Sequence, residues 1–182
     1  MKTLNKILTA VFTLTAFAAS AQDDVKNVKT IVDAVTVNCG APAWGKDSLK
    51  AIENYSLYRE FKKQGDNQTD LETKIRYYND AYIGWKYIYT NAPSARETPH
   101  LDGYDIYSAY AEAAEAKGST ALAKAYTDSM LAIYDIRIHC FGSTADLQMR
   151  KAFAWYSLNN KGNEAYVFEL FNETVEAFNK EE

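Results

Sequence analysis

The sequence predicts an all-α protein built from about three antiparallel helix pairs. Apolar and aromatic side chains recur every three to four residues over most of the 182-residue chain, which is the spacing of one helix face. Short segments rich in Gly, Asn or Pro interrupt this pattern, although the chain holds only 8 Gly and 3 Pro. A single helix of this kind cannot bury its apolar face, so we expect consecutive pairs to stack side by side.

The first 21 residues have the layout of a secretory signal peptide. Lys2 and Lys6 precede an uncharged segment at 7–19, and Ala19-Ser20-Ala21 offers small residues for cleavage. The apolar segment is shorter than the ~20 residues of a membrane-spanning helix. We therefore predict an exported protein, located in the periplasm, at the outer membrane or outside the cell. The alternative is a buried N-terminal helix.

Residues 22–47 are expected to form a lead segment ahead of the helical domain. The valines of 25–37 have helical spacing, but the density of Val, Ile and Thr also suits a strand, and both remain open. Cys39 and Cys140 can form a disulfide in an oxidising compartment. The alternative is two separate thiols, because the sequence carries no information on the Cβ geometry that a disulfide needs.

Residues 48–182 form the predicted helical domain. Asp47 or Ser48 can cap its first helix, and the pair Thr69 and Glu72 matches a capping box that opens the second. A loop with Pro99 and Asp102-Gly103 is expected before the third helix. The predicted helices span residues 48–64, 70–90, 104–117, 119–139, 144–159 and 163–179. We interpret their aromatic stripes, including Phe168, Phe171, Val175 and Phe178 of the last helix, as core.

The second predicted helix resembles the second helix of a tetratricopeptide repeat. Steps of four, three and five residues separate its small, aromatic, apolar and proline anchors, which are Ala81, Trp85, Ile88 and Pro93. The turn Gln64-Gly65-Asp66 fits the pattern, whereas 67–80 is an insertion relative to it. This resemblance implies a tetratricopeptide-like right-handed solenoid of stacked helix pairs.

Several longer segments are similar to a family of exported, repeat-containing proteins from Bacteroidota. They lie at 41–48, 54–61, 91–96 with 102–103, and 134–138 with 141–142. The similarity implies export and a helical-repeat fold, and it supplies no catalytic residues.

The charge of the chain points away from nucleic acid and from anionic lipid. The formal net charge is −4, and loss of residues 1–21 would leave 18 basic against 24 acidic residues, a net charge of −6. Both kinds of partner need a basic face. No later segment has an apolar run of spanning length, so no membrane span is expected in the mature chain.

No catalytic motif is present, and we predict no enzyme activity and no cofactor or metal. His100 and His139 are the two histidines, and phosphate-loop, serine-hydrolase and zinc motifs do not occur. Arg96, His100, Asp102 and Tyr104 group in one expected loop, where they can hold a small polar ligand. We prefer the simpler interpretation that Asp102 caps the next helix and Arg96 pairs with a surface carboxylate.

The predicted binding surface is a groove on the inner face of the stacked pairs. With the turns at Gly65 and Gly118 as register, the first helix of each pair lines this face. The residues expected to face the groove are Ile52, Tyr55, Arg59, Lys62, Ser108, Glu112 and Glu115. Cations at one end and acids at the other suit an extended or helical peptide of split charge. The alternative is that these charges are only solvated.

These features predict a non-catalytic exported helical-repeat protein that mediates protein–protein interaction or assembly in the cell envelope. Its expected partners are other envelope proteins or peptide segments. The alternative is a helical module that contacts a carbohydrate or nutrient ligand during envelope uptake.

Overall fold

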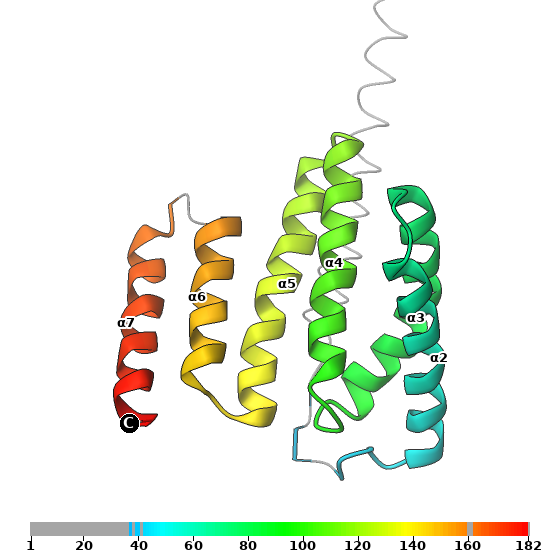
Figure 1. Cartoon of the computed structure of the whole chain (residues 1–182), viewed down its shortest axis with the longest axis horizontal. Coiled ribbons are helices and arrows are strands. Elements are labelled where there is room, and N and C mark those ends of the chain that lie inside the picture. Colours follow the sequence, from blue (N-terminus) through cyan, green and yellow to red (C-terminus); the bar gives the residue numbers. More distant parts are fainter. Residues whose placement is uncertain (1–36, 38, 41, 160–161, 182) are drawn as a thin grey trace, which may run out of the picture.

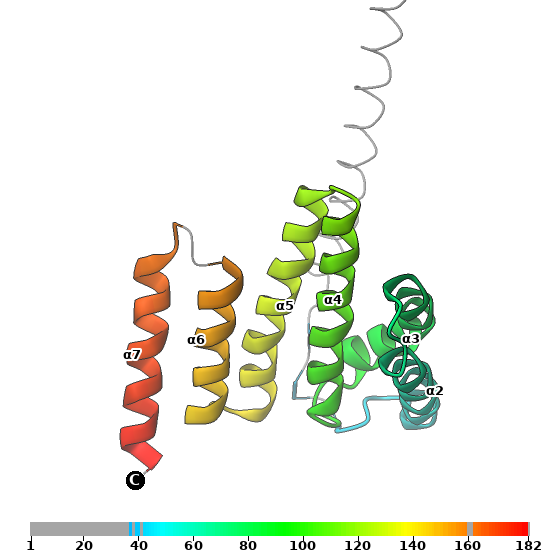
Figure 2. The same cartoon turned by 45° about the horizontal axis from the view of Figure 1, so that its top comes forward.

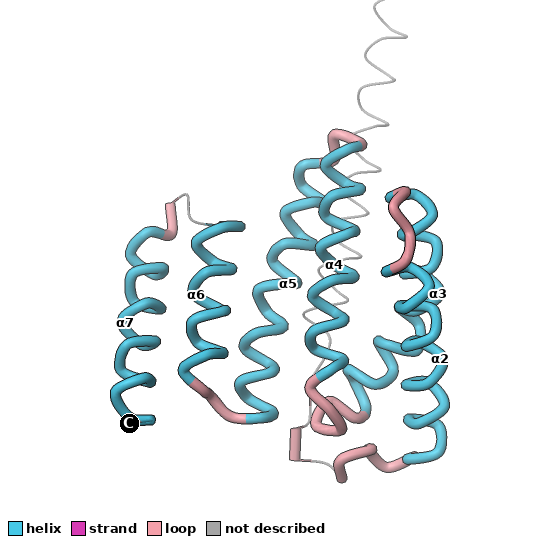
Figure 3. Tube along the Cα trace, in the orientation of Figure 1, coloured by secondary structure: helices cyan, strands magenta, loops and turns pink. Residues whose placement is uncertain are grey.

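The computed structural model describes residues 37, 39–40, 42–159 and 162–181, and all regular secondary structure within them is helical (Figure 3). The helices of this part of the chain are α2 (Ser48–Asp66), α3 (Leu71–Asn91), α4 (Thr98–Ala116), α5 (Thr120–Phe141), α6 (Ala145–Asn159) and α7 (Glu164–Glu181). The all-α prediction is confirmed. The predicted signal peptide at 1–21 and nearly all of the segment 25–37 lie outside the described residues.

The helices pack against one another in chain order. The pairs α2–α3, α4–α5 and α6–α7 are each in contact, and neighbouring pairs meet through α3–α4 and α5–α6. In Figure 1 the first pair lies at one end of the molecule and α7 at the other. After the rotation of Figure 2, α2 and α3 are seen nearly end-on while α4 to α7 stay upright, so the first pair is inclined to the later helices.

Aspartates cap the first two helices. The carboxylate of Asp47 accepts a hydrogen bond from the amide of Lys50 at 3.1 Å, as the sequence predicts. At the start of α3, Asp70 accepts from the amide of Thr73 at 2.8 Å, so the cap lies one residue after the predicted Thr69. A carboxylate is the stronger acceptor at the positive end of a helix, which explains the shift.

The third helix begins earlier than predicted, at Thr98 instead of residue 104. Pro99 lies in the first turn of α4, where its missing N–H breaks no helical hydrogen bond. Asp102 and Gly103 therefore lie inside the helix, and the prediction that Asp102 caps it is wrong. The glycine serves packing: a Cβ at Gly103 would lie 2.4 Å from the ring of Trp85.

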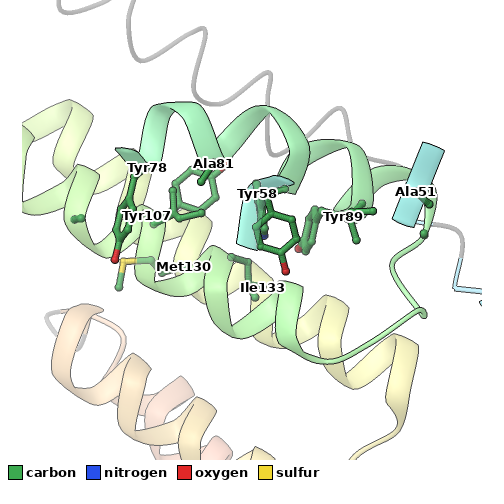
Figure 4. Close-up of a cluster of buried hydrophobic side chains, with 13 residues drawn as sticks. Ala51, Tyr58, Tyr78, Ala81, Tyr89, Tyr107, Met130 and Ile133 are labelled. Atoms are coloured by element: carbon green, nitrogen blue, oxygen red, sulfur yellow. The ribbon is translucent and has the colours of Figure 1, made fainter. Parts of the chain in front are cut away.

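The principal core lies within the first two pairs (Figure 4). All the tetratricopeptide anchors identified in the sequence, Ala81, Trp85, Ile88 and Pro93, are buried. The Trp85 ring stacks on Tyr89 with centroids 4.8 Å apart, and its indole N–H donates to the carbonyl of Pro99 at 2.6 Å. This tryptophan thus joins α3 to the start of α4.

The last pair differs from the prediction that all aromatic stripes are buried. Phe168 of α7 is 66% exposed, and Val175 and Phe178 are also exposed. Phe153, on α6, is exposed as well, although its ring lies edge-on against Phe171 at 5.3 Å. Within the described residues the main packing partner of α7 is α6, and much of its apolar face stays exposed.

A disulfide joins Cys39 to Cys140, which is one of the two alternatives that the sequence leaves open. The bridge fixes the chain ahead of α2 to the C-terminal end of α5. The Ser94 hydroxyl also donates to the carbonyl of Cys39 at 2.7 Å, and Val37 packs against the core.

Candidate functional site

Two of the predicted groove residues, Arg59 and Lys62, bond to carboxylates of α4. The Arg59 guanidinium donates to an oxygen of Asp102 at 2.6 Å, and the hydroxyl of the adjacent Tyr58 donates to the same oxygen at 3.1 Å. Sequence reasoning missed this contact because it placed Asp102 in a loop. Proline is common in the first turn of a helix, so Pro99 could have indicated that Asp102, three residues later, lies inside the helix.

Lys62 is the centre of a second group of ionic contacts. Its ammonium lies 2.7 Å from Asp66 and 3.0 Å from Asp105, and 3.8 Å from Asp102. The Lys62 side chain is only 4% exposed, so the expectation that it lines an open groove is not met. The Tyr78 hydroxyl donates to Asp66 at 2.6 Å and thereby adds α3 to the network.

These groups keep their ordinary protonation states at neutral pH. Burial alone would lower the pKa of Arg59 and Lys62, but the hydrogen bonds to Asp102 and Asp66 raise both pKa values. Burial would raise the pKa of Asp66, yet its hydrogen bond from Lys62 lowers it. Burial and the neighbouring Asp102 raise the pKa of Tyr58. The network therefore holds α2 against α4.

The other predicted groove residues occupy different surroundings. The Tyr55 ring is half-buried and lies edge-on to Trp44 and Tyr58, with centroids 5.6 and 5.4 Å away. Ile52 is exposed on α2. The remaining three are exposed on α4 and are Ser108, Glu112 and Glu115.

The residues expected in one loop are also separated by the fold. The Arg96 guanidinium lies 5.8 Å from the ring centroids of Trp44 and Tyr55, an arrangement typical of a cation–π contact, and not against a surface carboxylate as predicted. His100 and Tyr104 lie within α4, and their rings contact rings of α5.

A cleft of about 410 Å³ opens between α3 and the α4–α5 pair. Four tyrosines from three helices share its wall, with ring centroids 5.3 to 6.3 Å apart, and they are Tyr82, Tyr107, Tyr110 and Tyr126. The rest of the lining is Ile75, Asn79, Ala113, Ala114, Lys117, Ser119 and Leu122. We refer to this feature as the tyrosine cleft.

The first half of α3 forms one side of the tyrosine cleft. The first turns of α3 fall within 67–80 and supply Ile75 and Asn79 to the wall. Opposite them, Ala113 and Ala114 are small and leave the space open. The sequence predicts these tyrosines as core and does not predict the cleft. Two small residues shortly after Tyr110, Ala113 and Ala114, are the only sign of it in the sequence.

The chemistry of the tyrosine cleft is that of neutral binding groups. Burial raises the pKa of Tyr82, Tyr107 and Tyr110, so their hydroxyls stay protonated. The exposed side chains of Asn79 and Lys117 add an amide and a cation at the rim. Such a surface can stack on, and hydrogen-bond to, a ligand or peptide side chain.

Comparisons with protein-family models, with curated proteins and with solved structures find no match for this chain. No helix in the described ranges combines the length and the apolar character needed to cross a bilayer. In the same part of the chain, no three His, Cys, Asp or Glu side chains are grouped so as to hold a metal ion.

Proposed function

We propose that this chain is an exported, non-catalytic helical-repeat protein that binds segments of other cell-envelope proteins. The observation that carries the proposal is the tyrosine cleft, a hollow between two helix pairs with tyrosine rings in its wall. Packing of the helices in chain order and the buried anchors around Trp85 support a tetratricopeptide-like arrangement. The layout of residues 1–21 and the disulfide support export.

A peptide segment suits the tyrosine cleft in size and in chemistry. Ligand pockets in proteins commonly measure ~300–1,000 Å³, a range that includes this cleft. An apolar side chain can lie against the tyrosine rings, and aromatic anchors contribute most to protein interfaces. The Asn79 amide can bond to the peptide backbone, and Lys117 favours a partner with a carboxylate nearby.

Photo-crosslinking in the native envelope tests this proposal. A photo-reactive phenylalanine analogue at Asn79 is expected to give discrete adducts with an envelope protein, while the analogue at the exposed Ser157 on α6 gives none. In the chain labelled at residue 79, Tyr110→Ala should reduce the adducts at least tenfold and the control Tyr156→Ala should not. Equal labelling from residues 79 and 157, or no adduct from residue 79, would reject the site.

The alternative partner is a carbohydrate or nutrient ligand, because tyrosine rings and an amide also suit a sugar face. A thermal shift of the purified chain with soluble envelope glycans, lost in Tyr110→Ala, would favour it. If the glycans give this shift and residue 79 gives no protein adduct, the carbohydrate proposal would replace the protein-binding proposal.

A further inference from the structure

A second cavity, of about 240 Å³, lies between α4, α5 and α6. It is lined by His100, Leu101, Tyr104, Asp105, Ile133, Tyr134, Arg137 and Arg150. We call it the arginine pocket. It shares no lining residue with the tyrosine cleft, because its α4 residues precede those that line the cleft.

His100, one residue of the arginine pocket, has a buried hydrogen-bond acceptor that has no partner. His100 is 1% exposed, and its Nε2 lies 3.0 Å from the carbonyl oxygen of Pro93. A carbonyl only accepts, so Nε2 carries the hydrogen and Nδ1 presents a lone pair. Burial lowers the pKa of His100, which keeps the ring neutral. Nδ1 is buried and makes no hydrogen bond.

The same pocket contains a buried donor without a partner. Arg137 on α5 donates through Nη2 to Glu97 at 2.5 Å, but its Nε is buried and unbonded. Arg150 reaches the pocket from α6 and uses its Nε for Asp146 at 2.8 Å. Guanidinium groups have five N–H donors, so both arginines keep donors for a ligand.

The lining of the arginine pocket holds two cations and one acidic residue. Asp105, the acidic residue of the lining, is bonded to the Lys62 ammonium at 3.0 Å. Arginine matches the planar geometry of a carboxylate, which accepts two parallel hydrogen bonds from it. Beside the arginines, the rings of Tyr104 and Tyr134 pack edge-on at 5.7 Å and form an apolar side.

We propose that the arginine pocket binds a small carboxylic acid that carries a hydroxyl group. The carboxylate accepts hydrogen bonds from Arg137 and Arg150, and the hydroxyl donates to Nδ1 of His100. The volume is below the ~300–1,000 Å³ of sites for larger ligands, so a short acid or a single ring is the right size. This inference does not depend on the function proposed for the tyrosine cleft.

Three probes test the carboxylate and the hydroxyl of the proposed ligand independently. Isothermal titration of the purified, disulfide-bonded chain compares glycerate, which has both groups, with propionate and glycerol, which have one each. We expect glycerate to bind at least tenfold more tightly than either. Equal affinities for the three probes, or no binding of glycerate because water alone fills the pocket, would overturn the proposal.

His100→Gln provides a matched variant. Its amide nitrogen can still donate to the carbonyl of Pro93, but its acceptor, Oε1, lies on a flexible chain and is not fixed at the position of Nδ1. It should reduce glycerate affinity at least tenfold and leave propionate affinity unchanged. The control Arg76→Gln, at an exposed position on α3, should change neither. Unchanged glycerate binding by folded His100→Gln would overturn the role of the histidine.

A measurement on the unaltered chain keeps the proposal testable if that variant does not fold. The ¹⁵N resonance of the His100 Nδ1 should shift when glycerate saturates the chain, because the lone pair then accepts a hydrogen bond. Glycerol at the same concentration should leave it in place. An unmoved Nδ1 resonance in saturating glycerate would contradict the assigned contact.

Discussion

At the scale of single residues, two cations of α2 bond to carboxylates of the same chain. Arg59 and Lys62 were expected to recruit a partner, but Asp102 and Asp105 of α4 already bond to them. A helical register predicts the face on which a charge lies. It does not reveal whether a neighbouring helix brings a counter-charge, because that depends on the crossing of two elements distant in sequence.

Removing Asp102 tests the structural role of this network. Asp102→Ala leaves the buried Tyr58 hydroxyl without an acceptor and the Lys62 ammonium short of one carboxylate. We expect the free energy of unfolding to fall by about 2–4 kcal/mol, since unpaired buried polar groups are costly. Urea denaturation measures the change. Glu112→Ala, an exposed carboxylate on the same helix, should change stability by less than ~0.5 kcal/mol. Similar effects of both variants would show that the network adds nothing.

At the scale of helices, close packing at two glycines positions the first three helices. Gly84 of α3 faces α2, where an added Cβ would lie 2.7 Å from the carbonyl oxygen of Asn54. Gly103 of α4 faces Trp85 of α3. Both glycines are helical, so their role is to allow close approach and not to make turns.

Gly103→Ala should therefore destabilise the fold even though alanine is the better helix former. The new Cβ would lie 2.4 Å from the Trp85 ring, which cannot move freely because its N–H is bonded to the carbonyl of Pro99. Overpacking of this kind destabilises a protein by ~1–3 kcal/mol. The higher helix propensity of alanine stabilises the helix by at most ~1 kcal/mol. A net loss in thermal or urea unfolding is expected. A more stable Gly103→Ala chain would contradict it, and Ser108→Ala serves as the exposed control.

Helix positions were largely predictable from the sequence, and the site was not. The period of apolar residues and the stops at Gly118 and Gly142 placed five of the six helix starts within one residue. The sixth helix, α4, begins earlier than predicted. Pro99 and Gly103 are typical of loops, but Pro99 lies in the first turn of α4 and Gly103 allows a close helix contact. The tyrosine cleft forms where α3 meets α4 and α5. The periodicity of a single segment does not predict such a feature.

At the scale of the whole molecule, burial is uneven. The principal hydrophobic cluster is formed by α2 to α5, with residues from Ala51 to Ile133. The last pair contributes a smaller contact, and aromatic residues such as Phe168 stay exposed. Periodicity identifies an apolar face equally well in all six helices, but it does not tell which faces receive a neighbour. We infer that the first two pairs form the more stable part of the described chain.

The disulfide should strengthen this difference between the two parts. Cys39 and Cys140 are 101 positions apart and enclose α2, α3, α4 and all of α5 except its last residue, but neither α6 nor α7. Removal of a native disulfide typically costs ~2–5 kcal/mol, and the chain-entropy estimate for a loop of this length is near the upper end. We expect the Cys39→Ser and Cys140→Ser double variant to lose that much stability. Hydrogen exchange should accelerate in the core amides of α2 to α5 and change little in α6 and α7. Reductant should reproduce the effect in the unaltered chain and leave the double variant unaffected. Uniform acceleration across all helices would instead show that the chain opens as one cooperative unit, and unchanged exchange would show that the bridge does not stabilise the fold.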